Sequence, residues 1–357
     1  MAEPDMIADI VGRPYAHDYV KPDVFVNVFK PLIGSHNLLV SEGHEHKRAR
    51  QMLNAAFHFV NLRSMVSIMT NETAKAIDRY FSISQSKYID LHMEMSNLTL
   101  SIIMSSAFVI TDRRQGRSIS LCAGSDLLDL LLSAVDSDGH SFTDEEIKDQ
   151  PLTFVLAGHE TTSNLMAWVM YVLMTNESVF RACREEVDKM LPSGTDPTYE
   201  LACNLVVREA ILQETLCLYS PAPLFVRKCI REHIIRKEGQ RQLHIPAGTT
   251  IVINSHALHR RVAYWSRPLE FDYTRWMRDP ITDLKPKLSH RFCYLPFAAG
   301  PHNCIGQRFA MLEAKLMLAM LVEQCDFIFE PGQKIVPEFI ITMRPKYGLR
   351  TRVSKRL

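Results

Sequence analysis

The stretch Phe297-Ala-Ala-Gly300-Pro-His302-Asn-Cys304-Ile-Gly306 decides how this sequence is interpreted, because it places one cysteine directly before a strongly amphipathic helical pattern. Free backbone amides and the positive end of the helix dipole would stabilise a thiolate there, and the glycines allow the backbone to approach something flat or close. A cysteine taken alone is more often a buried, inert core residue, so its neighbours must decide between the two interpretations.

Working outward, a second cluster, Ala157-Gly158-His159-Glu160-Thr161-Thr162, lies in the middle of the longest predicted helix, residues 143–174. It places an acid beside an alcohol and interrupts an otherwise apolar face. Taken alone it is equally a helix surface that meets solvent, because threonine within a helix is unfavourable but tolerated. Thr143 and Glu146 predict a capping box at the start of this helix, and Pro151 predicts a bend or a restart.

Apolar spacing of three and four residues predicts that most of the chain is helical. The predicted helices cover residues 42–60, 62–84, 91–108, 143–174, 176–190, 201–218 and 305–324. Strand patterns are few: residues 242–245 and 249–253 flank a turn of Pro246, Ala247 and Gly248. The fold class expected is therefore mainly α with small β-sheets.

The composition excludes several classes of protein. A chain of 357 residues with 46% hydrophobic and 23% charged residues is an ordinary globular protein. A net charge of +1 gives no bulk attraction to nucleic acid or to an anionic membrane. Eight cysteines without a CxxC pair predict reduced thiols in an intracellular protein, and the first residues match neither a signal peptide nor a membrane span. Because no ligand spacing recurs around Cys304, a zinc or iron–sulfur protein is disfavoured.

The cysteine stretch resembles the haem-binding loop of the cytochrome P450 family, F-x-x-G-x-R-x-C-x-G. The resemblance implies that Cys304 is the axial thiolate ligand of haem iron, held in a loop that includes Phe297, Gly300 and Gly306. His302 stands where the family usually has an arginine that contacts a haem propionate. A histidine can also donate to a carboxylate, but it is charged only part of the time near neutral pH, so haem retention could be weaker.

The helix cluster is similar to the distal motif of the same family, A-G-x-E-T-T, at every fixed position. The resemblance implies roles in O₂ and proton handling for two side chains. Thr161 would donate a hydrogen bond to the oxygen, and Glu160 would relay protons from water. Gly158 would leave room for the cofactor, and His159 would be structural.

A third cluster, Glu214-Thr-Leu-Cys217, resembles the family motif E-x-x-R with its arginine replaced by Cys217. In the family pattern this pair joins a second arginine, which here matches Arg275. The resemblance implies a buried network reduced to Glu214 and Arg275. The charges of these two still balance one to one, so neither need be buried unpaired. Losing a member of such a network nonetheless costs about 3–5 kcal/mol when a partner is stranded, so we expect weakened folding or haem loading rather than collapse.

Further matches concern arginines that bind haem propionates in the family. His46-x-x-x-Arg50 corresponds to W-x-x-x-R, so the resemblance implies cofactor contacts from His46 and Arg50, although Lys47, Arg48 and Arg50 could equally form one solvated basic face. Arg227 resembles another such arginine; the alternative for it is an ordinary surface charge.

The resemblance implies a domain organisation and a function. Residues 41–357 would form one cytochrome P450-like haem domain, incomplete in its fold, after a weakly assigned segment at 1–40. Only 17 residues separate Phe108 from Asp126, where the family places two helices that roof the substrate pocket. The function implied is a haem-thiolate monooxygenase, most similar to microsomal eukaryotic members. The alternative is a catalytically impaired haem-binding pseudoenzyme or a truncated isoform.

The cofactor expected is haem b, iron protoporphyrin IX. Electrons would come from NADPH through cytochrome P450 reductase or a similar donor, docking on a basic surface around Lys47, Arg48 and Arg308. The substrate would be a small molecule resembling a lipid, sterol or xenobiotic. The chain would be a monomer with no nucleic-acid partner, cytoplasmic as written, whereas full-length relatives belong to the endoplasmic reticulum membrane.

Overall fold

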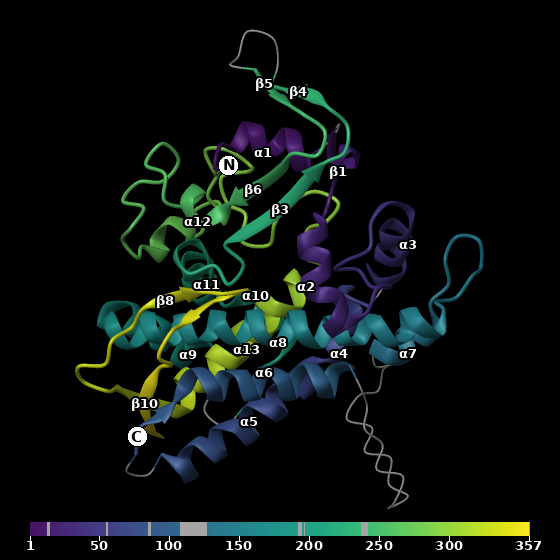
Figure 1. Cartoon of the computed structure of the whole chain (residues 1–357). Coiled ribbons are helices and arrows are strands. Elements are labelled where there is room, and N and C mark those ends of the chain that lie inside the picture. Colours follow the sequence, from purple (N-terminus) through teal and green to yellow (C-terminus); the bar gives the residue numbers. More distant parts are fainter. Residues whose placement is uncertain are drawn as a thin grey trace, which may run out of the picture.

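A computed structural model describes residues 1–12, 15–54, 56–84, 87–107, 127–191, 195, 197–236 and 242–356. The short segment between Phe108 and Asp126, where the sequence predicts that the family's lid helices are missing, lies outside the described residues. Among the described residues, helices predominate and the strands form small antiparallel sheets, as the fold class requires. Figure 1 shows one long helix, α8, crossing the molecule.

Helix α8 (Asp144–Thr175) is the spine of the fold. It begins with the predicted capping box, in which the Thr143 side chain accepts from the Glu146 amide while Glu146 accepts from the Thr143 amide. Its most extensive packing is against α6 (Leu91–Ala107). The residues from Thr162 to Met170 are all buried, so this half of the helix forms the centre of the core.

The other helices pack around this pair, as Figure 1 shows. α13 (Gln307–Gln324) contacts α5 (Val66–Ile83), α8, α9 (Glu177–Met190) and α11 (Val206–Leu218). One apolar cluster joins these helices and α6. The remaining helices of the described chain are α1 (Pro4–Val11), α2 (Asp23–Ile33), α3 (Gly43–Asn54), α4 (Phe59–Ser64), α7 (Leu127–Ser133), α10 (Tyr199–Asn204), α12 (Ser255–Leu258), η1 (Tyr15–Asp18) and η2 (Tyr273–Trp276).

Two three-stranded sheets and two hairpins complete the described fold. One sheet has the order β1-β3-β6 and the other β2-β10-β7, while β4 pairs with β5 and β8 with β9. The bounds are β1 (Tyr19–Val20), β2 (Ile89–Asp90), β3 (Leu224–Cys229), β4 (His233–Ile235), β5 (Leu243–Ile245), β6 (Thr250–Asn254), β7 (Cys325–Phe329), β8 (Pro337–Phe339), β9 (Met343–Pro345) and β10 (Arg350–Lys355).

The first forty residues are packed into the fold. Ile7, Ile10 and Val11 of α1 are buried in a second apolar cluster with Ile253 of β6 and Leu295. The backbone of β1 pairs with that of β3. The N-terminal part therefore helps to support the strand β3 and the loop that leads to Cys304.

Three helix predictions had the wrong bounds. The pattern at 42–60 stops at Asn54, and the next one is divided at Met65 between α4 and α5. The predicted helix 201–218 is two helices that meet at Leu205, because the Glu186 carboxylate of α9 accepts from the amides of Val207 and Arg208 and so caps α11. The predicted restart at Pro151 was also wrong, since α8 continues through it.

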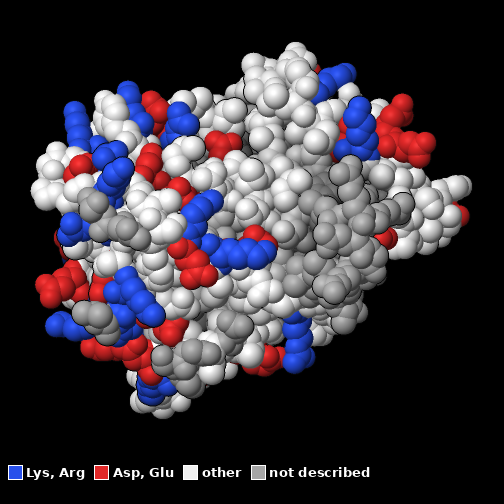
Figure 2. Space-filling view, turned by 90° about the horizontal axis from the view of Figure 1, so that it is seen from below, with Lys and Arg blue, Asp and Glu red and all other residues white. Residues whose placement is uncertain are grey.

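Among the described residues, no helix is both long enough and apolar enough to pass through a bilayer. Figure 2 shows the molecule from below, with positive and negative side chains mixed on one side and few charges elsewhere. Neither sign of charge dominates the described part of this face, in keeping with the net charge of +1.

Candidate functional site

A cavity of about 330 Å³ lies between α8 and the loop that precedes α13. It brings together most of the predicted site residues although they come from distant parts of the sequence. Eight of them line it: His46, Arg50, Gly158, Thr161, Phe297, His302, Cys304 and Gly306. Its apolar lining includes Phe57, Ile103, Phe154, Leu165, Leu216 and Phe309. The arrangement is a largely apolar pocket with a few converging polar groups, which is typical of a cofactor or ligand site.

The cysteine loop is closed by its own backbone, because the amide of Cys304 donates to the carbonyl of Phe297 at 2.9 Å. Gly300 has a φ of 77°, and a Cβ there would lie 1.9 Å from the Val11 carbonyl oxygen. The backbone that Gly300 approaches is therefore the end of α1. At Gly306 a Cβ would meet nothing closer than Cys304 Sγ and Phe57, both at 4.0 Å, so this glycine keeps space open beside the sulfur.

The Cys304 sulfur borders the cavity directly before α13, as the sequence predicts, and the residue keeps contact with solvent. Burial among protein atoms nonetheless raises the pKa of its thiol, opposed by the Gly306 amide, the Arg50 charge and the Gln307 amide. The amides favour the thiolate, as the sequence predicts, but burial outweighs them. A bound metal ion would supply the missing stabilisation, because metal ligation requires and favours the deprotonated sulfur.

Helix α8 supplies a second wall of the cavity, through Gly158, Thr161 and Thr162. The Thr161 hydroxyl donates to the Ala157 carbonyl of the preceding turn at 2.6 Å, which leaves its oxygen free to accept. A Cβ on Gly158 would lie 3.3 Å from Ile103 of α6, so the glycine also permits close packing of α6 and α8.

Glu160 is not part of the cavity lining. Its carboxylate accepts from the Thr342 hydroxyl at 2.6 Å, and the Asn164 side chain donates to the same hydroxyl oxygen at 2.9 Å. Thr342 lies between β8 and β9, so Glu160 faces this hairpin. His159, predicted to be structural, bonds to the Ser96 hydroxyl of α6 at 2.8 Å.

The polar wall of the cavity is built around His302. Its Nε2 lies 3.2 Å from Glu42 Oε2, and its ring lies against His46 with centroids 3.9 Å apart. Lys21 lines the cavity beside them, lies 3.5 Å from the Glu42 carboxylate and donates to the Ser41 carbonyl at 2.7 Å. His302 Nδ1 is buried and has no hydrogen-bond partner among the described residues; because Nε2 faces Glu42, Nδ1 donates only when the ring carries a second proton.

These contacts shift the pKa of each group on the polar wall. Burial alone would raise the pKa of Glu42, but the His302 hydrogen bond and the Lys21 charge outweigh it and lower the value to about 2. Burial lowers the pKa of Lys21 to about 8 and that of His46 to about 3, the latter helped by the charges of His302 and Lys21. Burial also lowers the pKa of His302. The wall holds one carboxylate and an excess of nitrogen donors.

The two predicted arginines differ in position. Arg50 lines the cavity and donates to both the carbonyl and the side-chain oxygen of Asn303, at 2.6 and 2.7 Å. Arg227 on β3 is buried, which removes the surface-charge alternative, but it does not line the cavity. Its charge lowers the pKa values of Lys21 and His302, so it adds positive charge behind the polar wall.

The predicted pair of Glu214 and Arg275 is present, with Arg275 Nε 3.2 Å from Glu214 Oε2. The same carboxylate also accepts from the Trp276 indole at 2.7 Å and from the Asp272 amide at 3.0 Å. Glu214 therefore keeps three donors although Cys217 replaces the arginine, and Glu214 and Arg275 are paired with each other, as their one-to-one balance of charge allows. Cys217 is buried in an apolar cluster that includes Trp276.

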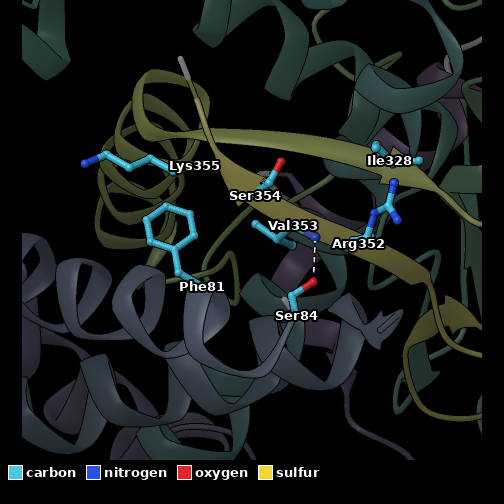
Figure 3. Close-up of a pocket in the computed structure, with 7 residues that line it drawn as sticks. All are labelled: Phe81, Ser84, Ile328, Arg352, Val353, Ser354 and Lys355. Atoms are coloured by element: carbon cyan, nitrogen blue, oxygen red, sulfur yellow. Dashed lines mark hydrogen bonds between the residues drawn. The ribbon is translucent and has the colours of Figure 1, made fainter. Parts of the chain in front are cut away.

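A second pocket of about 430 Å³ lies at the surface between α5 and β10. Figure 3 shows Ser84 pointing to Val353, whose amide donates to the Ser84 hydroxyl at 2.7 Å, while Arg352 and Lys355 point away from each other. The one buried hydroxyl in its lining, that of Ser84, is therefore already bonded to strand β10. The cavity at Cys304 is therefore the better candidate for a functional site.

Comparison with known proteins shows the family of this chain. The family model described as cytochrome P450 matches residues 109–350, which include Cys304, the α8 cluster and the pair of Glu214 and Arg275. This chain belongs to the cytochrome P450 family. Family membership makes it a P450-type monooxygenase by resemblance, with a haem cofactor, a redox partner and a small-molecule substrate as the family implies.

Three proteins illustrate how this P450 relates to others. It is 26% identical to cytochrome P450 4A2 of Rattus norvegicus over 99% of this chain and 80% of that relative. It is 32% identical to the cytokinin hydroxylase of Arabidopsis thaliana over 81% of this chain and 55% of that relative. The crystal structure of the cytochrome P450DA heme domain matches with a TM-score of 0.85 and 26% identity, over 100% of this chain and 86% of that one.

The alignments with these relatives cover more of the chain than the sequence motifs do. Those motifs begin near Ser41, whereas the aligned regions include almost the whole chain. Lys21 and Glu42 are the site residues that sequence analysis missed. Neither belongs to a motif, and only the partner His302, about 260 to 280 residues away in the chain, brings them to the site.

The cavity of this P450 fits a haem group in its donor set. It offers one sulfur, a space that a Cβ at Gly306 would fill, a largely apolar wall and a wall rich in nitrogen donors. An iron porphyrin with two carboxylates needs all four features. His302 Nδ1 is buried and without a partner among the described residues, and a carboxylate beside it would be satisfied if the ring took up a second proton.

Proposed function

We propose that this P450 is a haem-thiolate monooxygenase in which Cys304 is the axial ligand of haem b. The observation that carries the proposal is that Cys304, from the loop before α13, and Thr161, from the middle of α8, line one cavity. Bound haem would supply the oxidising chemistry, inserting one atom of O₂ into an organic substrate. The protein supplies binding, orientation and control of protons.

The haem carboxylates are assigned to the polar wall. Arg50, His46, Lys21 and His302 line the cavity there, with Arg227 behind them. His302 is already paired with Glu42, so it offers a carboxylate one nitrogen and no permanent charge. Lys21 would supply part of the positive charge that the family's arginine provides at the position of His302, because its ammonium is buried at the same wall.

Thr161 is assigned to hydrogen bonding within the cavity. Its hydroxyl can turn from the Ala157 carbonyl toward the cavity, so it can donate there as well as accept. Glu160 is assigned to delivering protons to Thr161. Because its carboxylate accepts from Thr342, it would have to leave this contact to reach the cavity, and Thr342 is therefore the side chain that restrains it.

We infer that electrons come from NADPH through cytochrome P450 reductase or a similar donor. Lys47 and Arg308 are exposed and suit a docking surface. Arg48 does not contribute to it, because its guanidinium pairs with Asp136 at 2.7 Å and Glu146 at 2.8 Å. A lipid, sterol or xenobiotic-like substrate agrees with the apolar cavity wall. We propose that the chain acts as a monomer.

A second candidate function is that of a haem-binding pseudoenzyme or truncated isoform. The observation that favours it is the pairing of His302 with Glu42, which puts a carboxylate where a haem propionate would bind. Repulsion between two carboxylates would weaken haem binding. Turnover separates the two functions: NADPH consumption with a partner reductase gives oxygenated product for the enzyme, and peroxide or nothing for the pseudoenzyme.

The carbon monoxide difference spectrum of the reduced, hemin-reconstituted chain tests the haem site itself. Ligation by Cys304 predicts a Soret band shifted to the position of a thiolate complex, and this band disappears in Cys304→Ala. Cys293→Ala is the control, because Cys293 is buried in another cluster and should leave the spectrum unchanged. Folded protein that binds no haem, or a thiolate band that survives in Cys304→Ala, would contradict the assignment.

A further inference from the structure

Glu313 is a buried acid that the proposed function does not use. It lies on α13, is 1% exposed, and neither of its carboxylate oxygens has a hydrogen-bond partner among the described residues. An ionised carboxylate without a partner in such a place is strongly unfavourable. The fold must therefore accommodate this side chain in some other state.

Thr162 of α8 is the neighbour that matters. Its hydroxyl is buried, has no partner of its own in the described structure, and acts on the Glu313 carboxyl closely enough to lower its pKa. The two groups do not meet in hydrogen-bond geometry. Rotation of the carboxyl about its terminal bond, which has a broad energy profile, changes that geometry without moving either helix.

The described residues around Glu313 include no charge that would ionise it. Burial raises its pKa to about 8, and within this part of the chain the Thr162 hydroxyl is the one group that opposes the rise. Helices α5, α8, α9, α10 and α11 pack on α13. Among their described residues, no charged side chain shifts the pKa of Glu313. At neutral pH the carboxyl is therefore mostly protonated and able to donate.

The pair lies directly behind the cavity wall. Thr162 lines the cavity next to Thr161, and Phe309 and Ala310 line it from the α13 turn that precedes Glu313. Helix α13 in turn begins just after the cysteine loop. A hydrogen bond between Glu313 and Thr162 would tie the polar segment of α8 to the helix that carries Cys304.

We propose that Glu313 is a neutral carboxylic acid that donates a hydrogen bond to the Thr162 hydroxyl and positions the Thr161–Thr162 segment of α8. It is a positioning residue and takes no part in ligand binding. The proposal concerns the protein alone, so it stands or fails separately from haem ligation by Cys304.

Infrared difference spectroscopy of the purified chain tests the proposal. Wild type minus Glu313→Gln should show the carbonyl band of a protonated carboxylic acid at pH 7, and the band should move in Thr162→Val but keep its place in Thr162→Ser. Glu323→Gln on the same helix is the matched control, because Glu323 is partly exposed and its replacement should leave the acid band in place. Absence of the acid band, or a band that ignores Thr162→Val, would overturn the proposal.

Denaturant unfolding gives a second readout that does not rely on the infrared band. The midpoint difference between Glu313→Gln and wild type should widen in favour of the variant as the pH rises from 5 to 8, because the glutamine keeps a donor and cannot ionise. A difference that stays constant with pH would show that Glu313 is already charged in the fold. Haem-loading results do not enter either test.

Discussion

Two acids, one partly buried and one fully buried, lie behind different walls of one cavity and are held in opposite protonation states. Glu42 has Lys21 and His302 as partners, and its pKa falls to about 2. Among the described residues Glu313 has only Thr162 beside it, and burial raises its pKa to about 8. Burial acts to raise the pKa of both acids, and nearby donors and charges reverse that effect only at Glu42. The acid behind the polar wall is ionised and paired with charged neighbours, whereas the acid behind the apolar wall is neutral.

The largest expected effect is on the apolar side. A carboxyl whose pKa is higher in the folded state than the ordinary 4.5 loses stability as pH rises between 4.5 and about 8. The slope is at most about 1.4 kcal/mol per pH unit. Glu313→Gln should abolish this slope, measured by denaturant unfolding at several pH values. Equal slopes in both proteins would remove the contrast between the two acids.

Glu214 extends the comparison to a third buried acid, one with three donors. Glu214→Leu would leave Arg275, the Trp276 indole and the Asp272 amide without their acceptor. Stranding a buried charged partner costs about 3–5 kcal/mol, and we expect about 3 because Arg275 also donates to backbone carbonyls. The measurement is the free energy of unfolding, with Glu209→Leu as a less buried acid on the same helix for control. A loss below about 1 kcal/mol, within the range of surface ion pairs, would show that this network is dispensable.

The polar wall should respond to Lys21→Met by about 2 kcal/mol, less than a fully buried pair, because Glu42 keeps His302 and some solvent. The loss should be present between about pH 5 and about pH 8, where Glu42 is ionised and Lys21 is charged, and it should diminish as the pH falls from 4.5 toward 2, since protonated Glu42 no longer needs the ammonium. Unfolding midpoints of wild type and variant across that window provide the check. A loss that is independent of pH would mean that Lys21 acts through packing.

The two walls also differ in how far the sequence predicts them. The α8 and α13 sides follow from apolar periodicity and from motifs that are local in the chain, and Cys304, Thr161 and Gly158, which those motifs single out, line one cavity. Lys21 and Glu42 were missed because their relation to His302 exists only in the folded chain. Thr342 contacts Glu160 across 182 positions of sequence, which no local pattern encodes. Strands β3 and β7 to β10 were missed for the same reason, since their pairing is not local.

The smallest expected effect on stability concerns Ala298, in the cysteine loop before α13. Ala298 has a φ of 57°, a left-handed conformation that costs a residue with a Cβ about 1–2 kcal/mol. Ala298→Gly removes this strain but adds freedom to the unfolded chain, so we expect a net gain of at most about 1 kcal/mol.

Ala299→Gly is the matched control for this change. Ala299 packs against the second apolar cluster and does not have a positive φ, so its replacement by glycine should lower stability. Denaturant midpoints of the two variants should therefore move in opposite directions from wild type. If both moved down, the strain at Ala298 would be too small to matter. The loop would then keep its shape through the contacts of Gly300 and the Cys304 amide rather than against a local preference of its backbone.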